Sequence, residues 1–426
     1  MANDKDFILK NAVEVGGPTN VTLGTVTSDN IDLSTGNYFK DTPTGTSTYT
    51  ISNAGDVQSF QLEVTGGTAE VAQNFSTTLY TGNGGAQTIT NDIDLSTDGG
   101  LVWVKQRDAS FNNILTDTER GVSKFLYSDQ TNAEETYSGY GVTAFNSDGF
   151  DVTDTTVYGV NKSAATYVSW AFKKAAGFFD IVTYTGDGVA GREIAHNLGA
   201  EVGTMIIKST SLSNSNWVVY HRSNANTEFM YLNGTVAKSS ALDWFNSTTP
   251  TTTAFTVNNY TKINGSGENF VAYLFAHDTA DDSLIKCGSF VNDAGSVGVE
   301  VNLGWEPQWL LIKGASSDSG LGHWYIYDNA RTGNILSPNQ SAAESADTSF
   351  ELTSNGFTPT TNFGGTLIYI AIRAASEPAI TWPSSIEWAG GIAPSAPAVG
   401  ETDLFTITTD DGGTTYTGVK TADNLS

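Results

Sequence analysis

Leu101-Val-Trp-Val-Lys105 is a short apolar run that ends in lysine, and two edited copies follow, Thr204-Met-Ile-Ile-Lys208 and Trp309-Leu-Leu-Ile-Lys313. The three lysines are 103 and 105 residues apart. Each copy closes on a second apolar run: Tyr167-Val-Ser-Trp-Ala-Phe172, Phe270-Val-Ala-Tyr-Leu-Phe275 and Leu367-Ile-Tyr-Ile-Ala-Ile372. Two independent landmarks that keep one period indicate that the chain repeats a module three times.

The period is that of a small domain. Solenoid repeats run to about 20–50 residues, whereas independent domains are commonly about 100–150 residues long. The apolar runs are short or alternate with period two, and Gly, Asn, Asp and Ser bound them, which is typical of strands. We therefore predict an all-β chain of tandem antiparallel β-sandwich domains, in three related repeats at residues 73–175, 176–283 and 284–376.

The two chain ends lie outside the repeat. Residues 1–72 and residues 377–426 each hold strand-like segments but are too short to bury a core alone. Because domain insertions are tolerated at exposed turns, we expect the two ends to form one split β attachment domain. In this hypothesis the three repeats are inserted between Gly67 and Ile380.

Helical patterns are weak throughout. We expect short helices or turns at one or two of three segments, residues 119–126, 236–245 and 341–347. In the lysine-ended strands, one face of the chain is expected to point into a core; its residues are Val102, Val104, Ile206, Leu310 and Ile312.

Composition excludes some classes of function. The chain has 426 residues, with 20 Lys and Arg against 46 Asp and Glu, a formal charge of −26. This charge argues against binding to nucleic acid or to an anionic membrane. The N-terminus does not resemble a signal peptide and no apolar run approaches about 18 residues, so we expect synthesis and folding in a cytoplasm without membrane insertion. The single cysteine, Cys287, permits no intramolecular disulfide.

Two motifs suggest ligands and have simpler explanations. Gly186-Asp-Gly-Val-Ala-Gly191 spells a dinucleotide-binding motif, but the residues after it favour a strand, so we interpret it as a hairpin turn. Asp92 to Asp98 and Asp278 to Asp282 offer oxygens to a structural divalent cation such as calcium, yet neither fits an EF-hand and both also suit turn capping. We therefore expect no cofactor, with a structural divalent cation kept as an alternative.

Catalytic signatures are also missing from the sequence. His196, His221, His277 and His323 lack metal-ligand spacing and are interpreted as structural histidines. There is no G-x-S-x-G nucleophile motif, and no reactive-site signature surrounds Cys287. We expect a non-enzymatic protein. A glycosidase pair of carboxylates is a spatial arrangement that sequence cannot exclude, so a polysaccharide depolymerase stays open as an alternative.

An aromatic set recurs in two copies and is the candidate ligand site. Its residues are Trp217, Tyr220, Trp324 and Tyr327. Sugars stack on such rings, so these residues are candidates for glycan binding. Because alternate residues of a strand face opposite sides, at least part of the set is expected to pack in a core instead.

Several of these segments resemble a repeat domain in virion proteins of marine tailed bacteriophages. The resemblance rests on Ile194-Ala-His-Asn-Leu-Gly199, Trp217-Val-Val-Tyr-His-Arg222 and Phe270-Val-Ala-Tyr-Leu-Phe-Ala-His277. Residues 108–173 resemble a variant that precedes this repeat, and Ile380 to Gly391 is similar to a terminal module of phage fibre proteins. The resemblance implies a virion appendage, commonly a homotrimer, and carries over no catalytic residues. Copy three departs most, since Val301 and Asp328 stand where copy two has His196 and His221.

We therefore expect a phage virion structural protein, a multimeric tail fibre or fibre-like appendage that adheres to the host surface by multivalent display. Its expected partners are itself as a homotrimer, other virion proteins and a host-surface glycan or protein. The first alternative is a purely architectural capsid decoration, head-fibre or connector protein. The second is the depolymerase.

Overall fold

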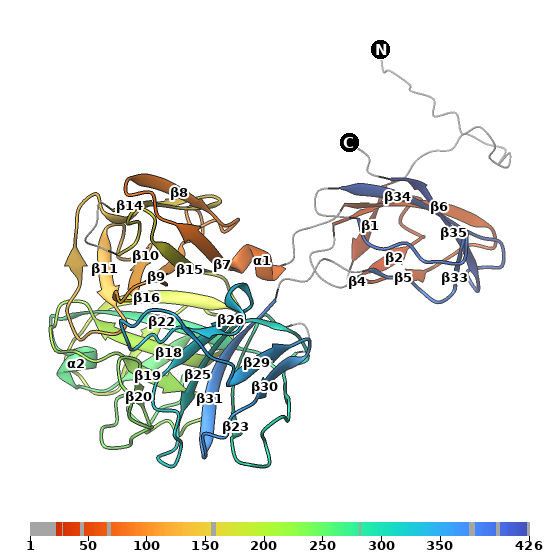
Figure 1. The fold of residues 1–426 in the computed structure, drawn as a ribbon. Helices are drawn as coiled ribbons and strands as arrows, with labels where there is room; N and C mark the ends of the chain where they lie inside the picture. Colours follow the sequence, from red (N-terminus) through yellow and green to blue (C-terminus); the bar gives the residue numbers. More distant parts are fainter. Residues whose placement is uncertain are drawn as a thin grey trace. The chain divides into compact units, whose positions relative to one another are not determined.

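The computed structural model describes residues 23–27, 29–42, 47–65, 70–154, 159–280, 283–374, 380–397 and 401–423. The chain divides into two compact units. The terminal unit comprises Met1–Ala69 and Ser376–Ser426, and the insert unit comprises Glu70–Ala375. Strands dominate both (Figure 1). The all-β prediction, with three related sandwiches and a split β-domain made by the chain ends, is confirmed.

Module 1 of the insert unit follows the short helix α1, Glu70–Asn74. Its strands are β7 Phe75–Thr81, β8 Ala86–Thr90, β9 Gly100–Gln106, β10 Ile114–Asp117, β11 Lys124–Tyr127, β12 Glu135–Thr136, β13 Gly141–Asn146, β14 Gly149–Thr153 and β15 Thr166–Lys173. They form a large sheet in the order β12-β11-β10-β9-β15-β7 and a small sheet in the order β13-β14-β8. The two sheets enclose a core.

Module 2 repeats this plan. Its elements are β16 Phe179–Thr185, β17 Arg192–Ala195, β18 Glu201–Ser209, β19 Val218–His221, β20 Met230–Tyr231, β21 Ala254–Val257, α2 Thr261–Asn264 and β22 Asn269–His277. The large sheet has the order β16-β22-β18-β19-β20, and β17 pairs with β21 in the small one.

Module 3 has the same two layers. Its elements are β23 Ile285–Val291, β24 Val301–Asn302, β25 Pro307–Gly314, β26 Tyr325–Asp328, the 3₁₀ turn η1 Asn329–Arg331, β27 Asn334–Ile335, β28 Ser345–Ala346, β29 Phe350–Thr353, β30 Gly356–Pro359 and β31 Thr366–Arg373. The large sheet is β23-β31-β25-β26, the small sheet is β24-β30-β29, and β27 pairs with β28.

The lysine-ended strands keep one register in all three modules. β9, β18 and β25 lie next to β15, β22 and β31, with Trp103 opposite Trp170, Ile206 opposite Tyr273 and Leu311 opposite Ile370. By this register Ile206 matches Trp103 and Leu311, not Val102 and Leu310. The expectation that Ile206 shares their face is therefore wrong by one residue, which in a strand reverses the face.

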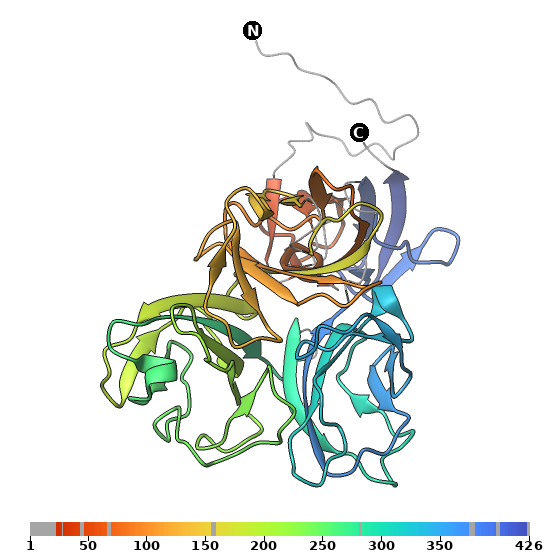
Figure 2. The ribbon, with the colours of Figure 1, turned by 60° about the vertical axis from the view of Figure 1, so that its left-hand side comes forward.

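The central strands of each large sheet are buried on both faces. In module 1, Val102 and Val104 face the sandwich core, whereas Leu101 and Trp103 belong to a second core shared by the three modules. Phe172 of module 1 marks the meeting point, since its ring centroid lies 5.6 Å from those of both Phe275 in module 2 and Trp309 in module 3. Figure 2 shows the modules side by side around this centre.

The terminal unit draws its core from both chain ends. Its strands are β1 Leu23–Thr27, β2 Asn30–Asp32, β3 Tyr38–Asp41, β4 Ser47–Thr48, β5 Thr50–Ser52, β6 Gln58–Thr65, β32 Ile380–Thr381, β33 Ile386–Trp388, β34 Thr402–Thr409 and β35 Tyr416–Ala422. They give one sheet, β33-β35-β34-β6-β3-β1-β2-β5, and the pair β32-β4. β6 and β34 join the ends, with Phe60 opposite Ile407 and Leu62 opposite Phe405. Unlike the modules, this unit mixes parallel and antiparallel pairs.

Two of the three segments expected to hold short helices or turns contain turns, and none of the three is helical. Residues 119–126 form turns that lead into β11, residues 236–245 are mainly irregular and end in a turn, and residues 341–347 include β28. Helices in the described ranges are short, and none has the length and apolarity needed to cross a membrane.

Candidate functional site

The three repeated lysines are buried and connect the modules. Lys105 donates to the carbonyl oxygen of Ser341 in module 3 at 3.1 Å, Lys208 to that of Thr131 in module 1 at 3.4 Å, and Lys313 to that of Thr235 in module 2 at 3.2 Å. Each also donates to the carbonyl of the residue that follows it. Burial lowers the pKa of Lys105 and Lys313 to about 8 and that of Lys208 to about 7.

Each lysine binds a segment that belongs to another module, and the three segments match one another. We call residues 131–134, 235–238 and 341–344 the crossing segments. The fourth residue of each donates its backbone N–H to the residue two positions after the lysine of the neighbouring module. These bonds are Glu134 to Thr210, Lys238 to Ala315 and Glu344 to Arg107, at 2.8, 2.9 and 2.8 Å. The same two bonds thus recur at all three interfaces, in one cyclic order.

The candidate residues Trp217 and Trp324 belong to these interfaces. Both rings are buried. The indole N–H of Trp217 donates to the carbonyls of Tyr127 and Gln130 in module 1, at 2.9 and 3.2 Å. The indole N–H of Trp324 donates to the carbonyl of Tyr231 in module 2, at 3.0 Å. These contacts place both indoles in intermodule packing, away from a surface on which a sugar can stack.

The other two candidates, Tyr220 and Tyr327, lie inside their own modules. Tyr220 is buried against Phe245, with ring centroids 5.5 Å apart. Tyr327 is buried and donates its hydroxyl to Asp347 at 2.6 Å. The four aromatic residues are therefore not brought together at one surface, and the packing alternative accounts for each of them.

A second set of matched positions carries polar groups into the shared core. Asp117, His221 and Asp328 end β10, β19 and β26. Asp117 accepts from the Tyr273 hydroxyl at 2.7 Å, and Asp328 accepts from the Trp170 indole at 3.0 Å, in each case across a module boundary. The two carboxylates also pair with buried arginines three residues later, Arg120 and Arg331, at 2.6 Å.

His221 takes the place of a carboxylate at the interface of modules 2 and 3. Its Nε2 lies 3.1 Å from the carbonyl oxygen of Tyr369, and its Nδ1 accepts the N–H of Ser223 at 3.2 Å. Burial lowers the pKa of His221 to about 4, so the ring is neutral. His196 and His277 also accept backbone N–H groups on Nδ1, and His323 contacts Asn339 and Gln340.

The candidate cation sites hold turns. Asp94 accepts the N–H groups of Ser96 and Thr97, both at 3.0 Å, and Asp278 accepts that of Ala280 at 3.0 Å. Asp281 and Asp282 lie outside the described residues. Within the described ranges, no three His, Cys, Asp or Glu side chains gather as metal ligands would.

The glycine motif at residues 186–191 is a loop between β16 and β17, which belong to different sheets, so the hairpin interpretation is wrong although a strand follows as expected. Its Asp187 accepts from the side chain of Asn264 at 2.9 Å, and strand β17 follows directly. Module 1 has the equivalent loop, in which Asn83 accepts from Asn161 at 2.9 Å. A buried asparagine therefore holds the same turn in both modules.

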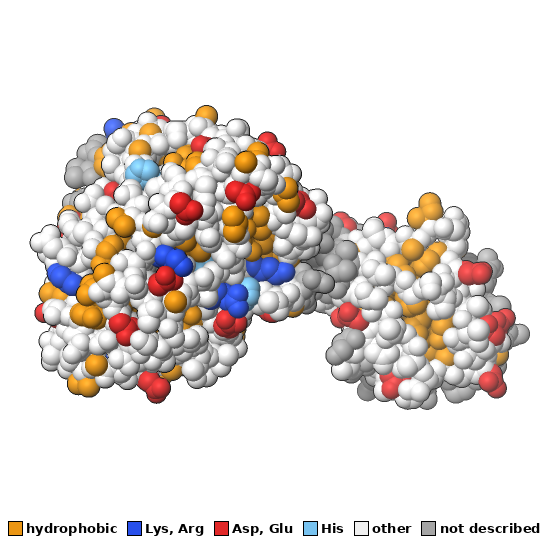
Figure 3. All heavy atoms as spheres, turned by 90° about the horizontal axis from the view of Figure 1, so that it is seen from below, with side chains coloured by type: hydrophobic (Ala, Val, Ile, Leu, Met, Phe, Trp, Pro, Cys, Tyr) orange, Lys and Arg blue, Asp and Glu red, His pale blue; other side chains and the backbone are white. Residues whose placement is uncertain are grey.

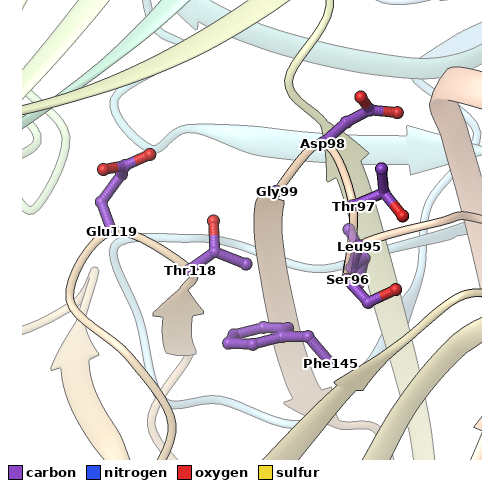
Figure 4. Close-up of a pocket in the computed structure, with 8 residues that line it drawn as sticks. All are labelled: Leu95, Ser96, Thr97, Asp98, Gly99, Thr118, Glu119 and Phe145. Carbon is purple, nitrogen blue, oxygen red and sulfur yellow. The ribbon is translucent and has the colours of Figure 1, made fainter.

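A pocket opens on module 1. It has a volume of about 440 Å³ and is lined by Leu95, Ser96, Thr97, Asp98, Gly99, Thr118, Glu119 and Phe145. Figure 4 shows Thr118 and Glu119 on one side, Ser96 to Asp98 on the other, and the Phe145 ring between them. Asp98 pairs with Lys173 at 2.8 Å, and Glu119 pairs with Lys174. Aromatic, hydroxyl and carboxylate groups thus meet in one concavity.

Comparison with protein families gives a match over the insert unit. A family model described as a domain of unknown function, DUF7483, matches residues 70–376. The chain belongs to the DUF7483 family. The matched range agrees with the insert unit, so DUF7483 is the three-module body as a whole and not a single repeat. No curated protein matches the chain.

Sequence reasoning missed two features of the DUF7483 unit. Asn113 stands in module 1 where Trp217 and Trp324 stand in the others, and its side-chain amide donates to Ser337 and Gln340 of module 3 at 3.2 and 2.9 Å. Asn113, Trp217 and Trp324 lie 8, 9 and 11 residues after the repeated lysines, so both the unequal spacing and the change of residue type concealed the match. The pocket was also missed, because its walls come from segments far apart in the chain.

Proposed function

We propose that this chain is a structural protein of a phage virion, a multimeric tail fibre or fibre-like appendage for host-surface adhesion. In this proposal the terminal unit attaches to the particle and the DUF7483 unit is displayed. The proposal includes no enzymatic activity. It places the protein in the virion and gives it other virion proteins and a host-surface glycan or protein as partners.

The observation that carries the proposal is the insertion of the DUF7483 unit into the unit that holds both chain ends. Residues 70–375 interrupt the sequence of the terminal unit, whose core is built from both chain ends. A body inserted in this way is anchored by two connections to one base. Such an arrangement suits display of a preformed body better than catalysis at a domain interface.

The sequence resemblance and the surface support the same proposal. Figure 3 shows carboxylates scattered over the face in view among uncharged groups, with few basic side chains. With a formal charge of −26, this surface favours solubility and resists non-specific association with nucleic acid. Neutral polar side chains between the carboxylates leave room for weak contacts that gain avidity when several chains are displayed together.

The proposed homotrimer makes its contacts away from the crossing segments. The crossing segments already have hydrogen-bond partners within one chain, since the lysine of each module donates to the crossing segment of another module. Trimer contacts then fall to the terminal unit or to the outer surfaces of the modules. Light scattering on the purified full chain tests this, and a monomer at micromolar concentration would contradict it.

The location of the chain on the particle tests the proposal. Antibodies against the DUF7483 unit, viewed by electron microscopy on intact virions, are expected to label tail appendages. Binding of the folded oligomer to host cells is expected to compete with adsorption of the phage. Label confined to the capsid would favour the architectural alternative, in which the bonds to the crossing segments only make the body rigid. Label absent from virions would overturn the proposal.

A further inference from the structure

The pocket of module 1 has the composition of a carbohydrate site. We propose that it binds one pyranose ring of a neutral sugar, in a host-surface polysaccharide if the proposed function holds. The inference therefore names the ligand class and the site for that function. It rests on the ring of Phe145, on the two carboxylates at the rim and on what the other modules have at the same place.

Phe145 supplies an apolar face. The residue lies on β13 and is half-buried against the core of module 1, so its ring is held while part of it borders the pocket. The C–H face of a pyranose packs on an aromatic ring, which removes apolar surface from water on both sides. A ring fixed by its own core loses little conformational entropy when the sugar binds.

The rim supplies acceptors that stay available to a ligand. The Asp98 side chain is 47% exposed and the Glu119 side chain is 34% exposed, although each carboxylate already pairs with a lysine. A carboxylate has about four lone-pair sites, so oxygens remain to accept sugar hydroxyl protons. Hydrogen bonds to ionised acceptors are about twice as strong as those between neutral groups.

Small residues keep the pocket open. Thr97 and Gly99 line it on one side and Thr118 on the other. Gly99 has a φ of +82°, and a Cβ built on it would meet the Thr118 hydroxyl oxygen at 2.7 Å. The volume of about 440 Å³ lies toward the small end of ligand pockets, which range over about 300–1,000 Å³. That size fits a single sugar unit of a chain.

Larger side chains stand at matching positions of the other modules. Counted from the repeated lysine, Thr97 corresponds to Trp305 in module 3, which is buried with the Lys286 ammonium 5.7 Å from its ring. Thr118, the residue after β10, corresponds to Arg222, the residue after β19 in module 2, which pairs with Glu201 at 3.0 Å. The fold therefore does not require small residues here, and module 1 combines them with the aromatic ring and the two carboxylates.

Charge selects among sugars. Asp98 and Glu119 lie at the rim of a chain whose formal charge is −26. Asp98 and Glu119 already engage Lys173 and Lys174, so the carboxylate of a uronic or sialic acid would have to compete for these lysines, and like charges at close range repel. Neutral hexoses and N-acetylhexosamines carry hydroxyl donors without that repulsion.

The test uses the full chain and defined probes. Methyl glycosides of glucose, galactose, mannose and N-acetylglucosamine are compared with methyl glucuronide by saturation-transfer NMR. At least one neutral glycoside is expected to bind with a dissociation constant on the order of 1 mM, and the glucuronide roughly tenfold more weakly. Failure of every neutral glycoside, or preference for the glucuronide, overturns the proposal.

Two variants locate the binding. Thr97→Trp places in module 1 the residue type that fills module 3, and binding is expected to weaken by at least about tenfold. Thr90→Trp puts the same residue at an exposed position of β8 and is expected to bind like the natural chain. Glu119→Gln keeps the shape and removes one charge, and should weaken neutral sugars while reducing the penalty on glucuronide. Unchanged binding in Thr97→Trp overturns the site, and melting temperatures establish that the variants fold.

The outcome separates this inference from the proposed function. If no sugar binds but the chain is found on tail appendages, the pocket proposal fails and the function stands. If Thr97→Trp abolishes sugar binding but the chain is absent from virions, the function fails and the pocket stands. Release of reducing sugar from host polysaccharide by the natural chain would overturn simple binding in favour of hydrolysis.

Discussion

Arg107 and Glu344 are joined twice across the boundary between modules 1 and 3. The backbone N–H of Glu344 donates to the carbonyl of Arg107 at 2.8 Å, and the guanidinium of Arg107 donates to both carboxylate oxygens of Glu344 at 2.7 and 3.0 Å. Glu344 also accepts from the buried Arg331 at 3.2 Å. One carboxylate therefore compensates two arginines at the point where the last module meets the first.

Glu344→Gln is expected to lower the free energy of unfolding by about 2 kcal/mol, because a buried ion pair loses one partner and Arg331 keeps only Asp328. Urea denaturation of the full chain measures this. The control is Glu201→Gln, which removes a carboxylate that is 51% exposed and should change stability by less than about 0.5 kcal/mol. Equal effects of the two variants would contradict a special role for Glu344.

Lys208→Met is expected to cost about 2 kcal/mol, because the carbonyls of Thr131 and Ser209 each lose a buried donor. The loss should appear in thermal unfolding and as increased amide hydrogen exchange across residues 131–134. Lys162→Met makes the same replacement at an exposed lysine and should leave both measurements unchanged. A stable variant with normal exchange would show that the lysine only fills space.

The lowered pKa of His221 predicts that the free energy of unfolding falls in mild acid. Its folded-state pKa is lowered from 6.5 to about 4, so between these values the unfolded chain binds more protons than the folded chain. Stability is then complete above pH 6.5 and falls by roughly 1.4 kcal/mol for each pH unit below it, until pH 4. The groups that face the ring are the Tyr369 carbonyl, the Ser223 amide, Arg222 and His277.

The measurement is the melting temperature from pH 7 to pH 4 in the natural chain and in His221→Gln. The variant should have lower stability at pH 7 and a shallower decline in acid. His196 and His277, whose pKa values burial also lowers, retain part of the decline in both proteins. Parallel curves for the two proteins would exclude His221 as the group responsible.

Gly186→Ala is expected to destabilise the DUF7483 unit by about 2 kcal/mol, because the added Cβ would lie 2.2 Å from the carbonyl oxygen of Gly265. The control is Gly85→Ala in the matching loop of module 1, where the nearest atom to a Cβ lies 3.8 Å away. Chemical denaturation of both variants measures the difference. Similar stability would show that the loop shifts without cost.

Joining residues 1–69 to residues 376–426 through a short flexible linker is expected to give a protein that unfolds cooperatively. The core supports this, because Phe60 and Leu62 of one piece lie opposite Ile407 and Phe405 of the other. Residues 1–69 alone should stay unfolded, since they lack the five buried core residues that come from residues 376–426. Circular dichroism and urea titration measure both, and a cooperative fold in the short piece would contradict a shared core.

The strands of this fold were predictable because the landmarks are local. Leu101 to Lys105 is apolar in every residue but the last, and a strand without polar alternation is typical of burial on both faces. That pattern was available in the sequence, yet what covers the second face was not. The shared core depends on contacts such as Phe172 with Trp309, which join residues from modules far apart in the chain.

The burial of polar side chains was harder to predict from the sequence than the strands. The sequence singled out Lys105 as a landmark, but a lysine at the end of a strand is usually at the surface. Its burial depends on the carbonyl of Ser341, which lies in a segment that sequence assigned to a short helix or turn. Buried indoles usually find a hydrogen-bond acceptor, yet the indole N–H of the buried Trp103 has none among the described residues.

The cyclic order of the lysine bonds limits how this family can change in length. In an open array each unit touches only its sequence neighbours, so a duplication or deletion of one unit leaves the others intact. Here Lys105, near the start of the DUF7483 unit, binds Ser341 near its end. A fourth copy would therefore have to break the bond between the first and last modules and form new ones. We expect relatives to differ by insertions in their loops, and the number of copies to stay at three.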